Sequence, residues 1–246
     1  MRWVLAVLII TASACWVGAT HPDEVYCAYS EARRWVSAAA PPARLPTPKP
    51  RETIPCPPVK QAATRVIRDQ YFPTGVLGCG EQSDELLTEW YAKHLKALGE
   101  PSLWELSRSD TQARVYRFLW LRSFHRPVAI RVIINSDLTA VAYVKVANGM
   151  GGYEPGPLVR NQRLPVGKHG SALLLSRIIE TRFWDLPSRG EPGGTDGAQW
   201  IVEGVTDGKY QVVDRWSPAD ADPIHALGMT FLTDIAGFQL SREELY

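Results

Sequence analysis

The stretch QWIVEGVTDGKYQVVDRW, residues 199–216, decides the fold expected for this chain. Two runs rich in Val, Ile, Tyr and Trp flank Asp207-Gly208, and such a two-residue connection favours a type I′ turn, because both of its central residues need a positive φ. The stretch is therefore predicted to form a β-hairpin. The turn also fixes the register, because Thr206 must face Lys209 and every later pair follows from that one.

This register gives the hairpin two faces, each of them partly apolar. One face holds the pairs Val205/Tyr210, Glu203/Val212 and Ile201/Asp214, and the other holds Gly204/Gln211, Val202/Val213 and Trp200/Arg215. Strands with apolar residues on both faces are typical of a sheet that is covered on both sides. We expect the hairpin to lie inside such a sheet rather than at a free edge.

Further strands and helices are expected upstream and downstream of the hairpin. Three strand-like runs, separated by short polar connections that predict an antiparallel meander, occupy residues 113–124, 128–135 and 139–146. Apolar residues at helical spacing predict helices at residues 83–98, 171–186 and 223–236. The fold class is therefore α+β, with about five mainly antiparallel strands in one sheet and helices packed on it.

The amino terminus has the pattern of an export signal. A basic Met1-Arg2 start, an apolar run and a stretch of small residues fill positions 1–19. Two processing sites fit this pattern: cleavage after Ala19, which we favour, or a loose lipobox that ends before Cys15 and leaves that cysteine lipid-modified. We therefore expect an exported protein that is periplasmic, secreted or lipid-anchored to the envelope.

The rest of the chain divides into three parts. Residues 20–40 are predicted to form an amino-terminal helix, and residues 41–59 form a Pro-rich linker that neither a helix nor a central strand can accommodate. Residues 60–240 then form a single α+β domain. Its length is sufficient for a hydrophobic core without covalent cross-links.

The cysteines that remain after processing are Cys27, Cys56 and Cys79. An exported protein forms disulfides, but three cysteines leave one unpaired within the chain, and the sequence leaves the pairing open. Cys79 precedes a predicted helix, where a catalytic thiolate would be stabilised. A structural role is the better interpretation, because no histidine partner or family signature accompanies it.

Charge and motifs exclude several classes of partner and cofactor. Lys and Arg number 27 against 26 for Asp and Glu, so the chain lacks the basic field that nucleic-acid binding needs. His94 lies on an apolar helical stripe without a second ligand four residues away, as a helical metal site requires. We expect no nucleic acid, no cofactor and no metal, and contact with a membrane only through a lipid at Cys15.

Glu203 and Asp214 are the best candidates for catalysis. They share one hairpin face in diagonal positions, and paired carboxylates at about 5–9 Å hydrolyse glycosidic bonds. The competing interpretation is that these acids pair with arginines that interrupt the apolar strands, Arg117 and Arg131 among them. We favour ion pairing, which makes a carboxylate-dependent hydrolase the alternative function.

Four residues are candidates for ligand binding. Trp200 beside Arg215 would form an aromatic and cationic surface for a sugar ring or a peptide. Tyr153 lies in the glycine-rich segment NGMGGYEPGP, whose backbone a ligand can approach closely. Arg131 would offer a positive charge to an anionic ligand. Exposure of Trp200 and Trp216 would favour ligand binding, whereas their burial would favour a structural role.

Two stretches carry a resemblance to known sequences: EWYAKHLKALGEPSLWEL at Glu89–Leu106 and DGAQWIVEGVTDGKYQVVDRWSP at Asp196–Pro218, with RFLWLRSFHRPVAIR between them. Together they resemble a group of uncharacterised exported bacterial proteins. The resemblance implies a bacterial origin and export, and it carries no activity. We therefore expect a non-catalytic binding or accessory module of the envelope, whose partner is an envelope protein or a glycan.

Overall fold

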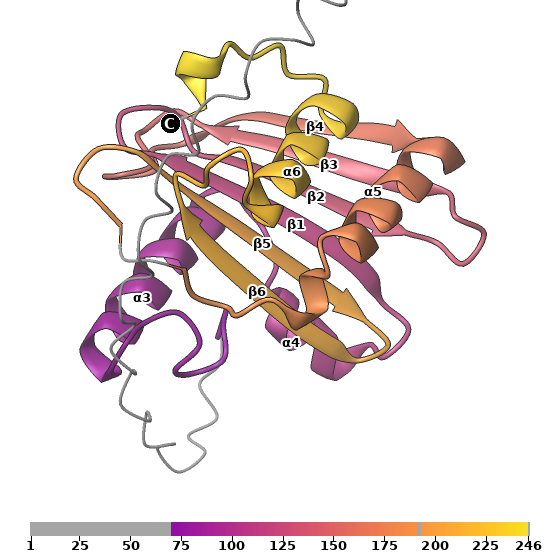
Figure 1. Ribbon diagram of the computed structural model, residues 1–246, viewed down its shortest axis with the longest axis horizontal. Coiled ribbons are helices and arrows are strands. Elements are labelled where there is room, and N and C mark those ends of the chain that lie inside the picture. Colours follow the sequence, from indigo (N-terminus) through magenta and orange to yellow (C-terminus); the bar gives the residue numbers. More distant parts are fainter. Residues whose placement is uncertain (1–69, 191–192, 246) are drawn as a thin grey trace, which may run out of the picture. The chain divides into compact units, whose positions relative to one another are not determined.

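The centre of the fold is one antiparallel sheet of six strands (Figure 1). The strands are β1 (Arg114–Arg122), β2 (Val128–Ile134), β3 (Ala140–Ala147), β4 (Leu158–Val166), β5 (Ala198–Thr206) and β6 (Lys209–Trp216). Their order across the sheet is β4-β3-β2-β1-β5-β6. This computed structural model describes residues 70–190 and 193–245, which all belong to one compact unit. The predicted export signal, helix 20–40 and linker 41–59 lie outside the described residues.

The hairpin forms with the predicted register. Asp207 and Gly208 have φ values of 50° and 71°, as a type I′ turn requires, and the pairs run from Thr206/Lys209 to Gln199/Trp216. The expectation that the whole hairpin is interior is wrong, because β6 is an edge strand. Residues 186–190 cover part of this edge instead: Asp214 N donates to Ser188 O at 2.7 Å and Gln211 Nε2 donates to Leu186 O at 2.7 Å.

The sheet is larger than expected because it contains β4, a strand that the sequence pattern does not predict. Its sequence LVRNQRLPV is mostly polar and contains Pro165, so it lacks the apolar alternation that identifies a strand. As the other edge strand it needs partners on one side only, and it pairs with β3 from Ala140/Val166 to Ala147/Leu158. An edge position tolerates both the proline and the polar side chains. The α+β class is confirmed, with six strands rather than about five.

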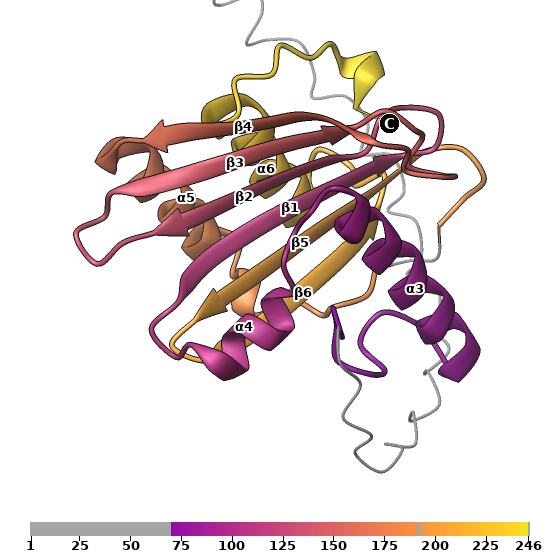
Figure 2. The same ribbon diagram turned by 180° about the vertical axis from the view of Figure 1, so that it is seen from behind.

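Helices cover both faces of the sheet. On the face seen in Figure 1 lie α5 (Lys168–Glu180) and α6 (Pro223–Met229), and the view from behind in Figure 2 shows α3 (Glu81–Ala97) and α4 (Leu103–Ser109). The chain also forms the short helices η2 (Phe183–Asp185), η3 (Thr230–Ile235) and η4 (Arg242–Glu244). The main core lies under α5 and α6, where Phe118, Trp120, Trp200 and Phe231 are buried together.

The face under α3 and α4 contains a buried ionic cluster. Glu203, Arg117 and Arg131 are neighbours on β5, β1 and β2, and Glu100 reaches them from the connection between α3 and α4. Arg117 Nε donates to Glu203 Oε2 at 2.8 Å, and Arg131 Nε donates to Glu100 Oε2 at 2.7 Å. Lys145 Nζ lies 2.9 Å from Glu100 Oε1. The predicted pairing of the sheet arginines with Glu203 is therefore correct for Arg117.

Glu100 and Arg117 are held in the ionised form by the charges around them, whereas burial outweighs the charge of Arg117 at Glu203 and raises the pKa of that carboxyl. Burial raises the pKa of Glu100, but the charges of Arg117, Arg131 and Lys145 outweigh burial and lower that pKa overall. Burial lowers the pKa of Arg117, and Glu203 and Glu100 more than offset this effect. The cluster is stable only while its members are paired, because an isolated charge costs several kcal/mol to bury.

We expect Arg117→Met to lower the free energy of unfolding by about 3–5 kcal/mol, because it leaves Glu203 buried without its cation. Urea unfolding at pH 7 measures this loss. The matched control is Arg163→Met on β4, where the arginine is exposed, and the double variant Arg117→Met/Glu203→Leu should recover much of the loss. An Arg117→Met protein as stable as Arg163→Met would contradict this account.

Candidate functional site

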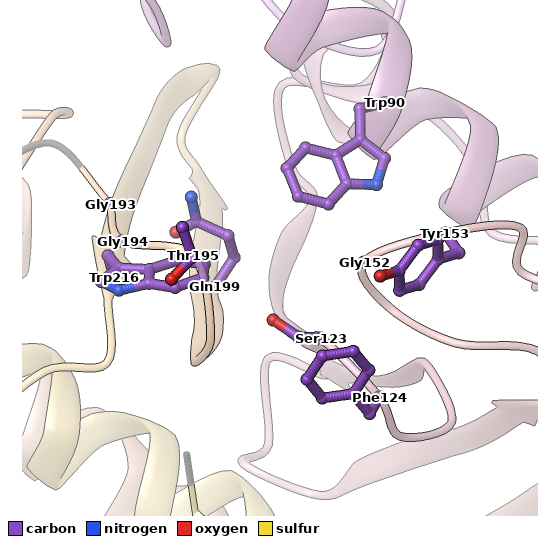
Figure 3. A pocket seen from close by; sticks show the side chains of 10 residues that line it. All are labelled: Trp90, Ser123, Phe124, Gly152, Tyr153, Gly193, Gly194, Thr195, Gln199 and Trp216. Carbon is purple, nitrogen blue, oxygen red and sulfur yellow. The ribbon is translucent and has the colours of Figure 1, made fainter.

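A pocket of about 300 Å³ lies beside the hairpin end where β5 begins and β6 finishes. Figure 3 shows its side chains arranged around an open centre, with Trp90 and Tyr153 opposite Trp216. The lining residues are Trp90, Ser123, Phe124, Gly152, Tyr153, Gly193, Gly194, Thr195, Gln199 and Trp216. Four of these described residues are aromatic, three have neutral polar side chains and none carries a charge.

One wall is built by the glycine-rich segment that follows β3. Gly151 N donates to His125 O at 2.8 Å and Gly152 N donates to Ser123 O at 3.1 Å, so the segment lies directly on the β1–β2 turn. A Cβ on Gly151 would come within 2.6 Å of the Arg122 backbone. The lack of side chains on these glycines therefore lets the segment pack directly against the backbone of the β1–β2 turn. This contact holds the ring of Tyr153 near that of Phe124, with the two ring centroids 6.1 Å apart.

The opposite wall depends on Trp216, the last residue of β6. A Cβ on Gly197 would lie 2.6 Å from its ring and one on Gly193 would lie 3.0 Å from it, so the segment before β5 packs closely against the indole. Ser123 fixes this segment from the other side, since its N donates to Gly197 O at 2.9 Å. The ring of Trp216 is consequently half-buried with one part open to the pocket.

Helix α3 supplies Trp90 and anchors the neighbouring segment through His94. The His94 ring is fully buried, with Nδ1 2.9 Å from Trp90 O and Nε2 3.4 Å from Met150 O. Burial lowers the pKa of His94. Its two ring nitrogens therefore serve packing between α3 and the glycine-rich segment. Within residues 70–190 and 193–245, no group of three or more His, Cys, Asp or Glu is placed to hold a metal ion.

Behind the pocket wall, Gln199 contacts a buried acid. Tyr91 Oη donates to Asp214 Oδ2 at 2.8 Å. With its NH₂ turned toward two acceptors, the Gln199 amide donates to Asp214 Oδ1 at 2.9 Å and to Arg215 O at 3.2 Å. Burial raises the pKa of Asp214 to about 6, although Tyr91 and the charge of Arg215 act to lower it. One pocket residue is thus directly coupled to a group that titrates near neutrality.

The two carboxylates proposed for catalysis are not presented to the pocket. They do occupy diagonal positions on one hairpin face, as the register predicts. Glu203, however, is fully buried, accepts from Arg117 and accepts from Tyr210 Oη at 2.9 Å. Neither Glu203 nor Asp214 lines the pocket. The pair therefore lacks the open, water-accessible arrangement that glycoside hydrolysis requires.

Three of the four predicted ligand-binding residues serve the interior of the fold instead. Trp200 is only 1% exposed and stacks on His225 with centroids 5.4 Å apart, so the expected surface beside Arg215 does not exist. Arg215 bonds to backbone oxygens of Asp214 and Pro187, and Arg131 belongs to the ionic cluster. Tyr153 alone of these four lines the pocket, and it is 59% exposed.

The sequence interpretation missed Trp90, Phe124 and Gln199, and named Trp216 only as a test of exposure. All of these except Trp90 lie at or near the end of a strand: Phe124 follows β1, Gln199 is the second residue of β5 and Trp216 ends β6. Residues at the ends of adjacent strands meet at one edge of a sheet, so this signal was available. Which of them face a pocket depends on α3, whose position the sequence does not define.

Cys79 forms a disulfide, which confirms the structural interpretation over the catalytic thiolate. Cys15, Cys27 and Cys56 lie outside the described residues. Across the part of the chain that the structure describes, no helix combines the length and apolarity needed to cross a bilayer.

We expect Asp214→Asn to be more stable than the wild type at pH 7.5. The pKa of Asp214 is raised from its ordinary 3.8 to about 6, so the folded state favours the protonated form. The contribution of the protonated Asp214 to the free energy of unfolding is complete below the pKa that Asp214 has in the unfolded chain, and it is lost as the pH rises through 6. The neutral amide avoids the loss, which amounts to about 2–3 kcal/mol above pH 7.

Urea unfolding at pH 4 and pH 7.5 measures this difference, which should nearly vanish at the lower pH. Asp234→Asn is the matched control, because Asp234 is exposed on η3. A wild type that is more stable than Asp214→Asn at pH 7.5 would show that the carboxylate is held in its charged form.

Comparison with known proteins assigns no family to the chain. No protein-family model matches it, and no curated protein matches it significantly. A proposal for its function therefore rests on its own residues.

Proposed function

We propose that this chain is an exported bacterial envelope protein that acts as a non-catalytic binding module, with the pocket of Figure 3 as its ligand site. The observation that carries the proposal is the grouping of four aromatic rings around about 300 Å³, together with neutral hydrogen-bonding side chains. Small-molecule sites combine mostly apolar walls with a few polar groups in this way, and their volumes begin at about 300 Å³.

The chemistry of the walls favours an uncharged glycan as the ligand. Aromatic rings such as Trp90 and Trp216 offer flat apolar surfaces to the C–H faces of sugar rings. Gln199 and Thr195 offer donors and acceptors to hydroxyl groups. A charged ligand would find no opposite charge among the described lining residues, and its desolvation would go uncompensated.

The rim of the pocket supports an interaction role. Phe124 is 49% exposed, and its partner Tyr153 is more exposed still. Met150, in the same segment as Tyr153, is also exposed. Large apolar side chains that gather at one place on a surface mark interaction sites more often than side chains that occur singly. The pocket and its rim thus form one aromatic surface.

Export is supported by the leader pattern of residues 1–19 and by the disulfide at Cys79. Disulfides persist in oxidising compartments and are rare in the cytosol. In the envelope, a neutral glycan strand is an available ligand for such a module. We favour a glycan over an envelope protein as the partner because the pocket is small and enclosed on several sides.

N-acetylglucosamine oligomers, added to the full mature protein, provide the first test of binding. We expect tryptophan fluorescence and calorimetry to report binding, and Trp90→Ala or Tyr153→Ala to weaken it at least about tenfold, the equivalent of roughly 1.4 kcal/mol per lost aromatic contact. Trp104→Ala is the matched control, because this half-buried tryptophan on α4 packs against Tyr210 rather than the pocket. Equal losses in all three variants, or no binding by the wild type at millimolar oligomer, would contradict the glycan proposal.

The processing of the leader is tested by expressing the whole chain in a bacterial host. We expect mass spectrometry of the envelope fraction to find a mature chain that begins at Thr20, because cleavage after Ala19 fits the small-x-small rule. A mature chain that begins at a lipid-modified Cys15 would support the anchored form instead. Recovery of the intact leader in the cytosol would contradict export.

A further inference from the structure

Tyr91, Asp214 and Gln199 form a closed ring of three polar contacts directly behind the pocket wall. Tyr91 Oη lies 2.8 Å from Asp214 Oδ2. The Gln199 amide lies 3.1 Å from Tyr91 Oη with one of its polar atoms and 2.9 Å from Asp214 Oδ1 with the other. All three side chains are buried from bulk water, and Gln199 alone also lines the pocket.

The number of hydrogens in this ring depends on Asp214. Three contacts need three hydrogens, of which the Tyr91 hydroxyl supplies one. The Gln199 amide supplies one more, whichever of its polar atoms faces Asp214, because only one of its ends carries hydrogens. The third hydrogen can come only from a protonated Asp214 carboxyl. The ring is therefore complete when Asp214 is neutral and lacks one hydrogen when Asp214 is charged.

When Asp214 is charged, the group left without a hydrogen bond is the carbonyl of Gln199, the residue of the ring that lines the pocket. The NH₂ group of Gln199 is directed by two acceptors, Asp214 Oδ1 and Arg215 O. When Asp214 is charged, the Tyr91 hydroxyl donates to the carboxylate, and the Gln199 carbonyl then faces an oxygen without a hydrogen between them. An unpaired buried carbonyl is costly, so it gains most from a new donor. A ligand hydroxyl in the pocket is such a donor.

We propose that Asp214 and Tyr91 are positioning residues for Gln199, and that loss of one proton from their ring makes the Gln199 carbonyl available to a ligand hydroxyl. Ligand binding then favours the charged ring, and it releases a proton when the ring was neutral before binding. This inference rests on the proposed function, and it adds a pH dependence and a ligand-selecting group to the same site.

The surroundings of Asp214 place this change within a mild pH range. Tyr91 faces it from α3 and Gln199 faces it from β5, while Arg215 on the same strand donates to the Asp214 backbone oxygen at 2.7 Å. Arg215 is partly balanced by Asp222, 3.7 Å from its Nε. Burial outweighs Tyr91 and Arg215 and raises the pKa of Asp214 to about 6, so the ring changes state between pH 5 and pH 7.

The ring is tested first without ligand, by NMR of the side-chain amide of Gln199 in the full mature protein. We expect its signals to shift with a midpoint near pH 6. In Asp214→Asn the introduced amide supplies the third hydrogen at every pH, so the Gln199 signals should stay at their low-pH position. Asp234→Asn should titrate as the wild type does. Gln199 signals in the wild type that do not move between pH 5 and pH 8 would overturn the proposal.

Binding of N-acetylglucosamine oligomers gives the second readout. We expect the wild type to bind about tenfold more weakly at pH 5 than at pH 7.5, because only about a tenth of the rings are charged one unit below the pKa. Asp214→Asn at pH 7.5 should bind at least as weakly as the wild type does at pH 5, because its ring is never charged.

The two proposals fail in different ways. If the Gln199 amide signals shift with pH in a protein that binds no oligomer, the glycan site is overturned and the ring of hydrogen bonds is supported. Equal affinity of the wild type and Asp214→Asn at both pH values overturns the ring and supports the glycan site.

Discussion

The ion pair between Arg117 and Glu203 is the constraint on which the rest of the structure depends. An arginine in the middle of a sheet must be paired, and this one aligns β1 with β5 at a single position of the ladder. Arg117 also bonds to Pro101 O at 2.6 Å, next to Glu100. The cluster thereby draws the connection between α3 and α4 onto the sheet, and this contact fixes the position of α3.

The position of α3 determines the pocket. One of its turns places Trp90 at the opening, Tyr91 over Asp214 and His94 against the glycine-rich segment. Two acids on one hairpin face therefore acquire different properties. Glu203 lies against Arg117, whereas Asp214 has a tyrosine and an amide as neighbours and no cation in direct contact with its carboxylate among the described side chains. Burial raises the pKa of both acids, but of the two only Asp214 contacts a residue that lines the pocket, so a change in its charge can influence the pocket.

Glycines complete the site by allowing backbones to meet. Gly151 and Gly152 bring the segment after β3 onto the β1–β2 turn, and Gly197 brings the segment before β5 onto Trp216. A side chain at any of these positions would collide with its neighbour. Segments that are distant in the sequence are thus held at one end of the sheet, where their aromatic side chains surround a common space.

The sequence by itself determined the hairpin register, the antiparallel meander and the pairing of a sheet arginine with Glu203. These follow from local rules, because a two-residue turn fixes alignment and a buried charge needs a partner. Only the tertiary structure decided that β4 is a strand and that Trp200 is buried while Trp216 lines a pocket. The polar β4 is stabilised by its neighbour rather than by its own pattern, and the fate of each tryptophan depends on which segment covers it. Packing between distant elements decides exposure, and no local pattern records it.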